Sequence, residues 1–320
     1  MHILRKVKMN DTISLGRNTV TRNEILKTFG ISLIYLLLSA WLIGFKSDQV
    51  VLILLFNTLY YASSLTRKFI LGFSIFIVYW ILYDYMKAIP NYLYHQVSIQ
   101  ELYTLEKGFF GISVNGVILT PNEYCKLYSK TGLDILSGLF YLMWIPVPLA
   151  FAAWLFFKNK REYLYFSLTF VLVNLLGFVI YYIYPAAPPW YIQIYGFVFH
   201  PGTPGNTGGL IRFDEYFQLP VFQTIYTKGS NVFAAMPSLH SSYPVIVLYY
   251  GIRNNLRWRN LFLTIVMLGI WFAAIYSSHH YVLDVIAGII CAITGILLFN
   301  RLKKTKLVNT FIHYMIALTS

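Results

Sequence analysis

The sequence predicts an all-α fold, a polytopic membrane helix bundle of about eight spans with a range of six to eight. Two observations lead to this fold class. Of the 320 residues, 58% are hydrophobic and only 12% are charged, whereas soluble domains carry roughly 25% charged residues. The apolar residues also gather in long runs, and basic residues separate every second pair of these runs. Such a chain is expected to cross a membrane repeatedly.

A membrane span needs about 20 apolar residues, or fewer where charged flanks reach the interface. Eight runs approach this length, and the second of them is short. They lie at about residues 28–45, 49–65, 69–86, 133–157, 163–184, 236–252, 260–277 and 279–300. The segment before Lys27 lacks the apolar core of a signal peptide. We therefore expect the first run to be a retained anchor.

The basic residues indicate how the chain is threaded. They precede the first run, separate the second from the third, the fourth from the fifth and the sixth from the seventh, and follow the eighth. This is the positive-inside pattern of an even number of spans with both termini in the cytoplasm. We therefore expect basic cytoplasmic tails at 1–27 and 301–320 and a single transmembrane domain at 28–300. The net charge of +13 is then explained by the basic residues that set the orientation in the membrane. Nucleic acid is not expected as a partner.

The junctions on the other side of the membrane carry the polar features of the chain. Residues 87–132 are expected to contain an interfacial amphipathic segment. Residues 184–240 form a long connection that is too aromatic for disorder, and such loops usually serve a function. The third junction is a tight turn at Ser277 and Ser278. Cys125 and Cys291 lie far apart and indicate neither a disulfide framework nor a zinc site.

One pair of polar residues opens the last apolar run. His280 and Asp284 are four positions apart, so on a helix they share a face and the carboxylate can orient the imidazole. An imidazole oriented in this way can act as a nucleophile or a base. The alternative is a histidine at a helix end that only packs against a polar neighbour.

A second histidine opens another apolar run on the same side of the membrane. In "MPSLH", residues 236–240, Pro237 is expected in the first turn of a helix, and Ser238 and His240 follow it. The first turn of a helix offers free N–H groups to an anion such as phosphate. By itself this motif is a weak signal, but two histidines at two helix starts on one interface are a stronger one.

These motifs carry a resemblance. P-S-x-H followed about forty residues later by H-x-x-x-D is similar to the second and third motifs of the type 2 phosphatidic acid phosphatase superfamily. "YPAAPPWY" (184–191), "GGLIRFD" (208–214), "AMPSLH" (235–240) and "SSHHYVLDVIAG" (277–288) resemble the fungal inositol phosphorylceramide synthase branch, with sphingomyelin synthases more distant. The match covers about residues 184–290. The resemblance implies a six-helix catalytic core, phosphotransfer without a metal and a phosphohistidine-type intermediate.

The chain also departs from the lipid phosphatases of this superfamily. They carry K-x6-R-P in a first motif and S-R before the histidine of the third, whereas this chain has Ala273 and Ala274 at the S-R positions. Arg212 remains as a conspicuous cation that could give a bidentate fork to phosphate oxygens, and Lys228 could add a second charge. One arginine suits a phosphodiester with a single charge better than a phosphomonoester. The alternative is that Arg212 only pairs with Asp214 at the surface.

Further residues are candidates for substrate or phosphate binding. Ser238 and the helix-end N–H groups are expected to bind the phosphate oxygens together with Arg212. His279 points away from His280 on a helix and has either an interfacial or a headgroup-binding role. Pro188 and Trp190 form either a helix stop with an aromatic belt or a wall of the headgroup pocket. Gly208 and Gly209 allow a close backbone approach. A metal bound by the histidines and Asp284 is disfavoured, because adjacent histidines on one helix diverge, and no cofactor is expected.

The resulting hypothesis is a lipid phosphotransferase with a phospholipid donor and a ceramide acceptor. His280, held by Asp284, attacks the phosphorus of phosphatidylinositol, and His240 protonates the departing diacylglycerol before it takes a proton from ceramide. The reaction is expected on the non-cytoplasmic face. The alternatives are a ceramide phosphotransferase with another headgroup, a lipid phosphatase that uses water, and a transporter or scaffold. The sequence does not support a regulatory subunit or a homo-oligomer.

Overall fold

The computed structural model describes residues 21–229 and 231–320, and it is all-α apart from one short hairpin. Within these described residues, six helical segments are long and apolar enough to cross a membrane, and they indicate an integral membrane protein. They are Arg22–Ile43, Ser64–Ala88, Thr131–Lys158, Lys160–Ile183, Arg259–Tyr276 and Val282–Leu302. The expected runs at 49–65 and 236–252 also form helices, but these are shorter, with 16 and 15 residues. The range of six to eight spans is therefore confirmed.

The described residues divide into two compact units, residues 21–74 with 318–320, and residues 75–317. Within the first, α1 (Arg22–Ile43) packs against α2 (Ser47–Ala62). α1 begins five residues before the expected end of the tail at Lys27, because Thr21 and Glu24 form a capping box there. α3 (Ser64–Tyr85) runs across the division between the units. Residues 1–20 of the expected tail lie outside the described residues, and the expected domain boundaries stay a prediction.

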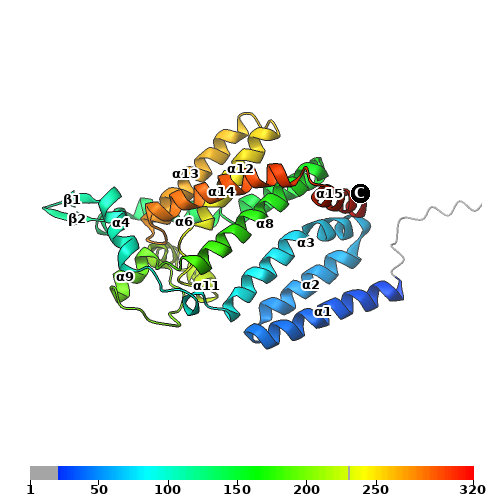
Figure 1. Ribbon diagram of the computed structural model, residues 1–320, viewed down its shortest axis with the longest axis horizontal. Coiled ribbons are helices and arrows are strands. Elements are labelled where there is room, and N and C mark those ends of the chain that lie inside the picture. The colour runs from blue at the N-terminus through cyan, green and yellow to red at the C-terminus, as the bar shows by residue number, and fades with distance from the viewer. Residues whose placement is uncertain (1–20, 230) are drawn as a thin grey trace, which may run out of the picture. The chain divides into compact units, whose positions relative to one another are not determined.

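The second unit is built around α12 (Leu239–Arg253), which packs against helices before and after it in the chain (Figure 1). The packing helices are α7 (Pro146–Lys158), α8 (Lys160–Ile183), α13 (Arg259–Tyr276) and α14 (Val282–Leu302). α6 (Thr131–Leu142) packs on α13. The expected span at 133–157 is therefore two helices, α6 and α7, because the second begins at Pro146, which has no N–H for a preceding turn.

The two long junctions contain short elements. Residues 87–132 form α4 (Gln100–Phe110), the antiparallel pair β1 (Ile112–Val114) and β2 (Val117–Leu119), and α5 (Pro121–Leu127), after the short helices η1 (Met86–Ala88) and η2 (Asn91–Leu93). Residues 184–240 form α9 (Pro189–Tyr195), η3 (Gly208–Leu210), α10 (Ile211–Phe217) and α11 (Val221–Thr227). Isolated bridges join Ser98 to Ala186 and Ala186 to Ala234, so the two junctions are tied to the segment that precedes α12.

Two helix boundaries differ from the sequence expectation at the candidate site. α12 begins at Leu239 with Ser238 as its N-cap, so Pro237 lies before the helix and not in its first turn. α14 begins at Val282, so His279 and His280 lie in the turn before the helix and not on it. The side-chain hydroxyl of Ser238 accepts the N–H of Ser241, and this capping bond fixes where α12 starts.

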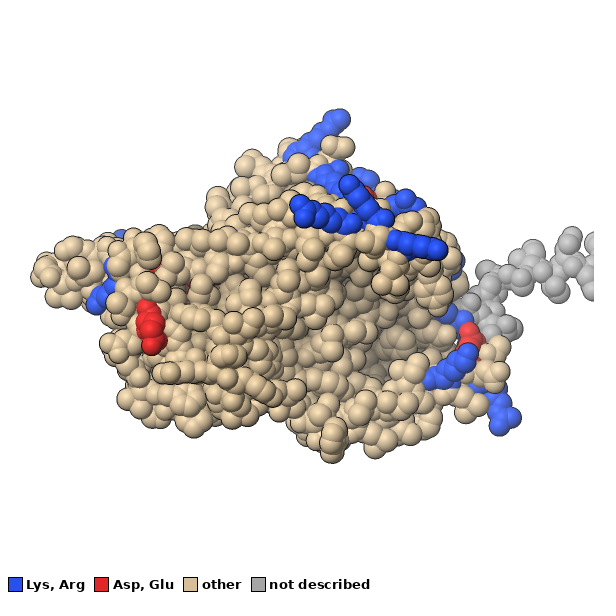
Figure 2. All heavy atoms as spheres, viewed as in Figure 1, with Lys and Arg blue, Asp and Glu red and all other residues tan. Residues whose placement is uncertain are grey.

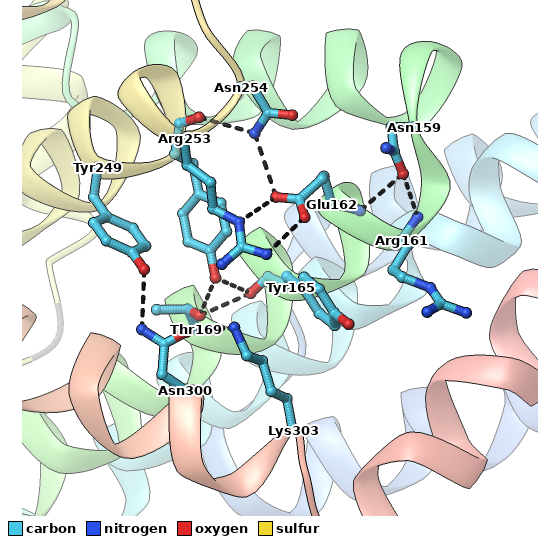
Figure 3. Close-up of polar contacts among 11 residues, drawn as sticks. Asn159, Arg161, Glu162, Tyr165, Thr169, Tyr249, Arg253, Asn254, Asn300 and Lys303 are labelled. Carbon is cyan, nitrogen blue, oxygen red and sulfur yellow. Dashed lines mark hydrogen bonds and ion pairs between the residues drawn. The ribbon is translucent and has the colours of Figure 1, made fainter.

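Polar contacts connect the N-terminal end of α8 with the C-terminal ends of α12 and α14 (Figure 3). Arg253 donates two hydrogen bonds of 2.7 and 2.9 Å to Glu162, and the Tyr250 hydroxyl donates to the Tyr165 carbonyl at 3.0 Å. In the second unit, Lys and Arg side chains gather where α12 and α14 end (Figure 2). The expected tail 301–320 instead contains a helix, α15 (Lys306–Thr319). The basic end agrees with the charge pattern of the sequence, and the orientation in the membrane stays a prediction.

A glycine on α14 allows the N-terminal end of α12 to lie close to α14. At Gly288 on α14, an added Cβ atom would lie 2.2 Å from the carbonyl oxygen of Ser238. The Ser242 hydroxyl also donates to the Gly288 carbonyl at 2.7 Å. A side chain at position 288 would therefore push the start of α12 away from α14.

We expect Gly288→Ala to destabilise the protein by about 1–3 kcal/mol, because it overpacks a backbone contact that cannot move alone. Transfer activity should fall with it, since the displaced segment carries His240 two residues after Ser238. Thermal unfolding in detergent and an activity assay would measure both effects. Gly108→Ala on α4 is the matched control, because its Cβ would meet no atom within 4 Å. Equal melting temperatures for both variants would contradict the prediction.

Candidate active site

Two histidines from separate helix starts meet in the second unit. The Nδ1 atom of His240, in the first turn of α12, lies 3.1 Å from the Nε2 atom of His280, before α14. The backbone N–H of Ser238 donates to the carbonyl of Asp284 at 2.9 Å, which joins the start of α12 to the first turn of α14. Both rings are therefore held by the same local contact, although they are 40 positions apart.

Asp284 is fully buried beside His280. Its Oδ2 atom lies 3.6 Å from the Nδ1 atom of His280 and accepts the backbone N–H of Tyr281 at 2.8 Å. The first distance is longer than a hydrogen bond, but no other described group pairs with Nδ1 of His280 or with Oδ1 of Asp284. A small rotation of the ring would close this contact, after which Nε2 of His280 would carry the free lone pair.

The turn that carries His280, residues 277–281, is named the catalytic turn after its proposed role, and hydrogen bonds to its backbone fix it. The N–H groups of His279 and His280 both donate to the Ala274 carbonyl, at 3.1 and 3.0 Å. The buried amide of Asn122, on α5, donates to the carbonyls of Ile275 and His280 at 2.7 and 2.9 Å. The turn is therefore held from both sides before any substrate binds.

Glu106 also supports this turn, and sequence reasoning missed it. This fully buried carboxylate on α4 accepts the N–H groups of Val282 and Leu283 at 2.9 and 3.1 Å, so it caps the start of α14. Burial raises the pKa of the Glu106 carboxyl above its usual value. In the sequence it is one acidic residue of an amphipathic segment, and its partners lie 176 and 177 positions away. No local pattern could have identified them.

His279 faces away from the histidine pair. Its ring stacks on Tyr226 and Tyr141, with centroid distances of 4.4 and 5.4 Å, and its Nε2–H donates to the Thr207 carbonyl at 2.7 Å. Burial lowers the pKa of His279 to about 3, so the ring is neutral at pH 7. These contacts fix the loop at Thr207 to the catalytic turn, and binding of the headgroup by His279 stays a prediction.

We expect His279 to make the protein less stable in acid. The pKa of histidine is about 6.5 in an unfolded chain, and it falls to about 3 here, so below pH 6.5 the unfolded state binds the additional proton. Between pH 7 and pH 5 this linkage lowers the free energy of unfolding by about 2 kcal/mol. His279→Gln keeps a donor for Thr207 but does not titrate. Thermal unfolding at both pH values should show a smaller acid loss for this variant, and equal losses would contradict the prediction.

Gly208 and Gly209 lie against the same turn. Gly208 has a φ of +51°, and a Cβ atom on it would lie 2.6 Å from the Ser277 carbonyl oxygen. The N–H of Gly209 donates to that carbonyl at 2.7 Å, and a Cβ atom on Gly209 would lie 2.9 and 3.0 Å from the two terminal nitrogens of Arg212. Only glycine permits this close approach of the loop to both the turn and the guanidinium.

Arg212 does not pair with Asp214, the partner considered from the sequence. Its Nε–H donates to Asp134 at 2.6 Å, whereas Asp214 accepts the N–H groups of Phe222 and Gln223 at the start of α11. The alternative of a surface pair with Asp214 is therefore wrong. Lys228 already has an interaction within the protein, and a phosphate contact from it stays a prediction.

Pro188 and Trp190 lie where α9 begins. Pro188 is the N-cap residue of α9, and the N–H of the buried Trp190 donates to the Ser278 carbonyl at 2.9 Å. The Cβ of Trp190 also faces Gly208, at 3.5 Å from the position of an added Cβ. Trp190 thus packs against the catalytic turn, and a contact with the headgroup stays a prediction. Ser238 is buried as well, with its hydroxyl accepting the N–H of Ser241 at 3.3 Å.

The comparison with protein families covers the segment that contains the histidine pair. Residues 121–298 match the PAP2 superfamily. They include both histidines, Asp284 and Arg212. The chain belongs to the PAP2 superfamily. Glu106 lies outside the matched residues, in the segment that precedes them.

Relatives of this PAP2 chain come from bacteria and fungi. It is 45% identical to a phosphoinositol dihydroceramide synthase of Bacteroides thetaiotaomicron, over 88% of this chain and 92% of that protein. It is 28% identical to an inositol phosphorylceramide synthase of Candida albicans and to an inositol phosphorylceramide synthase catalytic subunit of Schizosaccharomyces pombe. Both alignments cover 76% of this chain, and they cover 50% and 56% of the fungal proteins. No solved structure matches the chain significantly.

Metal ligands do not gather in the part of the chain that the structure describes. Within residues 21–229 and 231–320 no group of three or more His, Cys, Asp or Glu side chains could hold a metal ion. The candidate site of this PAP2 chain consists of His240 on α12, His280 on the turn before α14 and Asp284 on α14, with Arg212 on α10 near that turn.

Proposed function

We propose that this protein transfers inositol phosphate from phosphatidylinositol to ceramide or dihydroceramide and releases diacylglycerol. The observation that carries the proposal is the contact of 3.1 Å between His240 and His280, with Asp284 behind His280. The choice of substrates is supported by the name of the bacterial relative, a phosphoinositol dihydroceramide synthase that is 45% identical over 88% of this chain.

The first step forms a bond between phosphorus and His280. Nε2 of His280 attacks the phosphorus of phosphatidylinositol, while the bond from phosphorus to the diacylglycerol oxygen breaks. His240 in its protonated form gives a proton to that oxygen, so that neutral diacylglycerol leaves. Asp284 next to Nδ1 stabilises the positive charge that develops on the ring of His280.

The second step returns the phosphoryl group to an alcohol. His240 is now neutral and takes the proton of the primary hydroxyl of ceramide, whose oxygen attacks the phosphorus. The bond from phosphorus to Nε2 breaks, and both histidines regain their starting protonation states. One histidine thus serves first as the acid and then as the base.

The contact between the two rings has to open when the phosphate enters. An in-line displacement places the phosphorus between the attacking nitrogen and the leaving oxygen, and the proton donor lies beyond that oxygen. Rings only 3.1 Å apart leave no room for these atoms. His240 also lies against Tyr141 and Trp144, with the Tyr141 hydroxyl 3.2 Å from its Nδ1 atom and the ring of Trp144 at 4.4 Å. The Tyr141 hydroxyl can keep a hydrogen bond to His240 when the pair separates.

The phosphate oxygens would lie toward Arg212 and the turn before α14. Arg212 can stabilise the negative charge that builds on them. Ser238 would contribute through the start of α12, since its hydroxyl already caps this helix. Both lipids would enter from the membrane on the non-cytoplasmic side, opposite to the basic ends of α12 and α14.

The test uses the purified protein in detergent with labelled phosphatidylinositol and ceramide, and mass spectrometry of the lipid products. We expect inositol phosphorylceramide and diacylglycerol in equal amounts. Phosphatidylcholine and phosphatidylethanolamine serve as rival donors, and either of them outperforming phosphatidylinositol would contradict the headgroup. Release of free phosphate from phosphatidic acid, without transfer to ceramide, would instead identify a lipid phosphatase.

A further inference from the structure

Three side chains from three helices meet beside the catalytic turn. Asp134 lies in the first turn of α6, Tyr276 is the last residue of α13, and Arg212 lies on α10. The Oδ1 atom of Asp134 accepts the Arg212 Nε–H at 2.6 Å and the Tyr276 hydroxyl at 2.9 Å. The Tyr276 hydroxyl in turn accepts the N–H of Lys130 at 3.1 Å. Tyr276 therefore fixes the position of the Asp134 carboxylate, and the same carboxylate oxygen binds Arg212.

These contacts fix the guanidinium on several sides. Asp134 takes its Nε–H, the ring of Tyr276 lies 5.5 Å from its central carbon, and the backbone of Gly209 lies against its terminal nitrogens. An arginine in solution would lose considerable side-chain entropy in adopting such a fixed orientation. Here the entropy is lost on folding, before any ligand binds, which is how a binding site is preorganised.

One terminal nitrogen of the guanidinium, Nη2, is free to bind an anion. The Nη2 atom of Arg212 is buried and has no hydrogen-bond partner among residues 21–229 and 231–320. A buried donor without a partner is costly, so a missing partner is expected at this position. The site for that partner lies next to the catalytic turn, because the same Gly209 that contacts Arg212 donates its N–H to Ser277, three residues before His280.

The charges of this cluster also limit which anion fits. Arg212 carries one positive charge and Asp134 one negative charge, so the pair offers little net charge to a ligand. A phosphodiester carries one negative charge, whereas a phosphomonoester carries about −1.5 to −2 at pH 7. The buried carboxylates nearby, Asp284 on α14 and Glu106 on α4, add no positive charge. A dianionic headgroup would thus be poorly compensated.

We propose that Asp134, held by Tyr276, is a positioning and specificity-determining residue that aims Arg212 at a singly charged phosphodiester and disfavours phosphomonoesters. This inference rests on the proposed function, because it assigns the donor phosphate to Arg212. It adds a residue and a reason for the choice of donor that neither the motifs nor the relatives supply.

The experiment compares Asp134→Asn, Tyr276→Phe and Asp214→Asn with the wild type. Asp214→Asn is the matched control, since it removes a buried carboxylate from α10, the helix of Arg212, but has no contact with the guanidinium. For Asp134→Asn we expect the KM for phosphatidylinositol to rise at least about tenfold, with an unchanged KM for ceramide. Tyr276→Phe should give a smaller change in the same direction.

The second measurement is competition by phosphatidic acid. Asp134→Asn removes one negative charge next to the guanidinium, so the affinity for phosphatidic acid relative to phosphatidylinositol should rise about tenfold. A purely structural pair would lower the melting temperature and leave both this ratio and the ratio of the two KM values unchanged. That result, or equal effects of Asp134→Asn and Asp214→Asn, would overturn the proposal.

Failure of the proposed function can be distinguished from failure of the role proposed for Asp134. If the wild type does not use phosphatidylinositol, the proposed function fails at the first assay. The positioning of Arg212 by Asp134 is then tested by direct binding of soluble dioctanoyl phosphatidylglycerol, a phosphodiester, and dioctanoyl phosphatidic acid to the same four proteins. Unchanged relative binding of the two lipids by Asp134→Asn would overturn it there as well.

Discussion

Replacing His280 with alanine should lower transfer by at least about 10⁴-fold, because the variant loses the atom that is proposed to form the bond to phosphorus. The stability of the variant should change little, since the turn is held by backbone contacts to Ala274 and Asn122 rather than by the ring. The measurement is the rate of product formation from labelled phosphatidylinositol and ceramide, together with the melting temperature.

The half-reaction gives the sharper measurement. A covalent intermediate predicts that the wild type exchanges labelled diacylglycerol into phosphatidylinositol without ceramide, and that His280→Ala does not. His313→Ala, at an exposed histidine on α15, is the control and should behave as the wild type. Exchange by His280→Ala at a rate near that of the wild type would show that another group forms the bond.

Replacing His240 with glutamine should lower transfer from phosphatidylinositol by about 10²- to 10⁴-fold, which is the usual contribution of a general acid or base. Glutamine keeps a polar group near Tyr141 and His280 but cannot carry the proton to the departing diacylglycerol. A donor whose leaving group needs no proton should therefore react with this variant. The measurement compares phosphatidylinositol with a nitrophenyl phosphodiester of the same headgroup.

The comparison separates the two histidines. The nitrophenyl donor should restore the first step in His240→Gln to within about tenfold of the wild type, as release of nitrophenolate would report. It should not rescue His280→Ala, because that variant lacks the nucleophile. If His240→Gln lost equal activity with both donors, its role would be to position the phosphate and not to transfer a proton.

Much of the fold follows from local patterns. The apolar runs predicted the membrane helices, since a span requires about 20 apolar residues whatever it packs against. The boundaries were less accurate. Capping by Ser238 moved the start of α12 past Pro237, and the capping carboxylate of Glu106 belongs to a segment far away in the chain. Helix ends depend on which groups satisfy the free N–H donors, and such groups can come from any part of the chain.

The sequence alone determined the chemistry available to this protein. It predicted His240, His280 and Asp284 near two helix starts on one side of a membrane, because both the apolar periodicity and the motifs are local properties of the chain. The relation between Arg212 and its carboxylate was not determined in this way. Asp214 is two positions from Arg212, yet α10 directs it to the start of α11, while Asp134 reaches Arg212 from 78 positions away.

Only the tertiary structure decided how the catalytic turn is supported. Glu106, Asn122 and Asp134 lie on α4, α5 and α6 and contact groups between 78 and 177 positions further along the chain. Each is buried, and a buried polar group requires a partner wherever the fold provides one. The hydrogen-bond partner can come from any position along the chain. A single sequence therefore indicates which residues can react, while the packing of the helices decides which residues hold them in position.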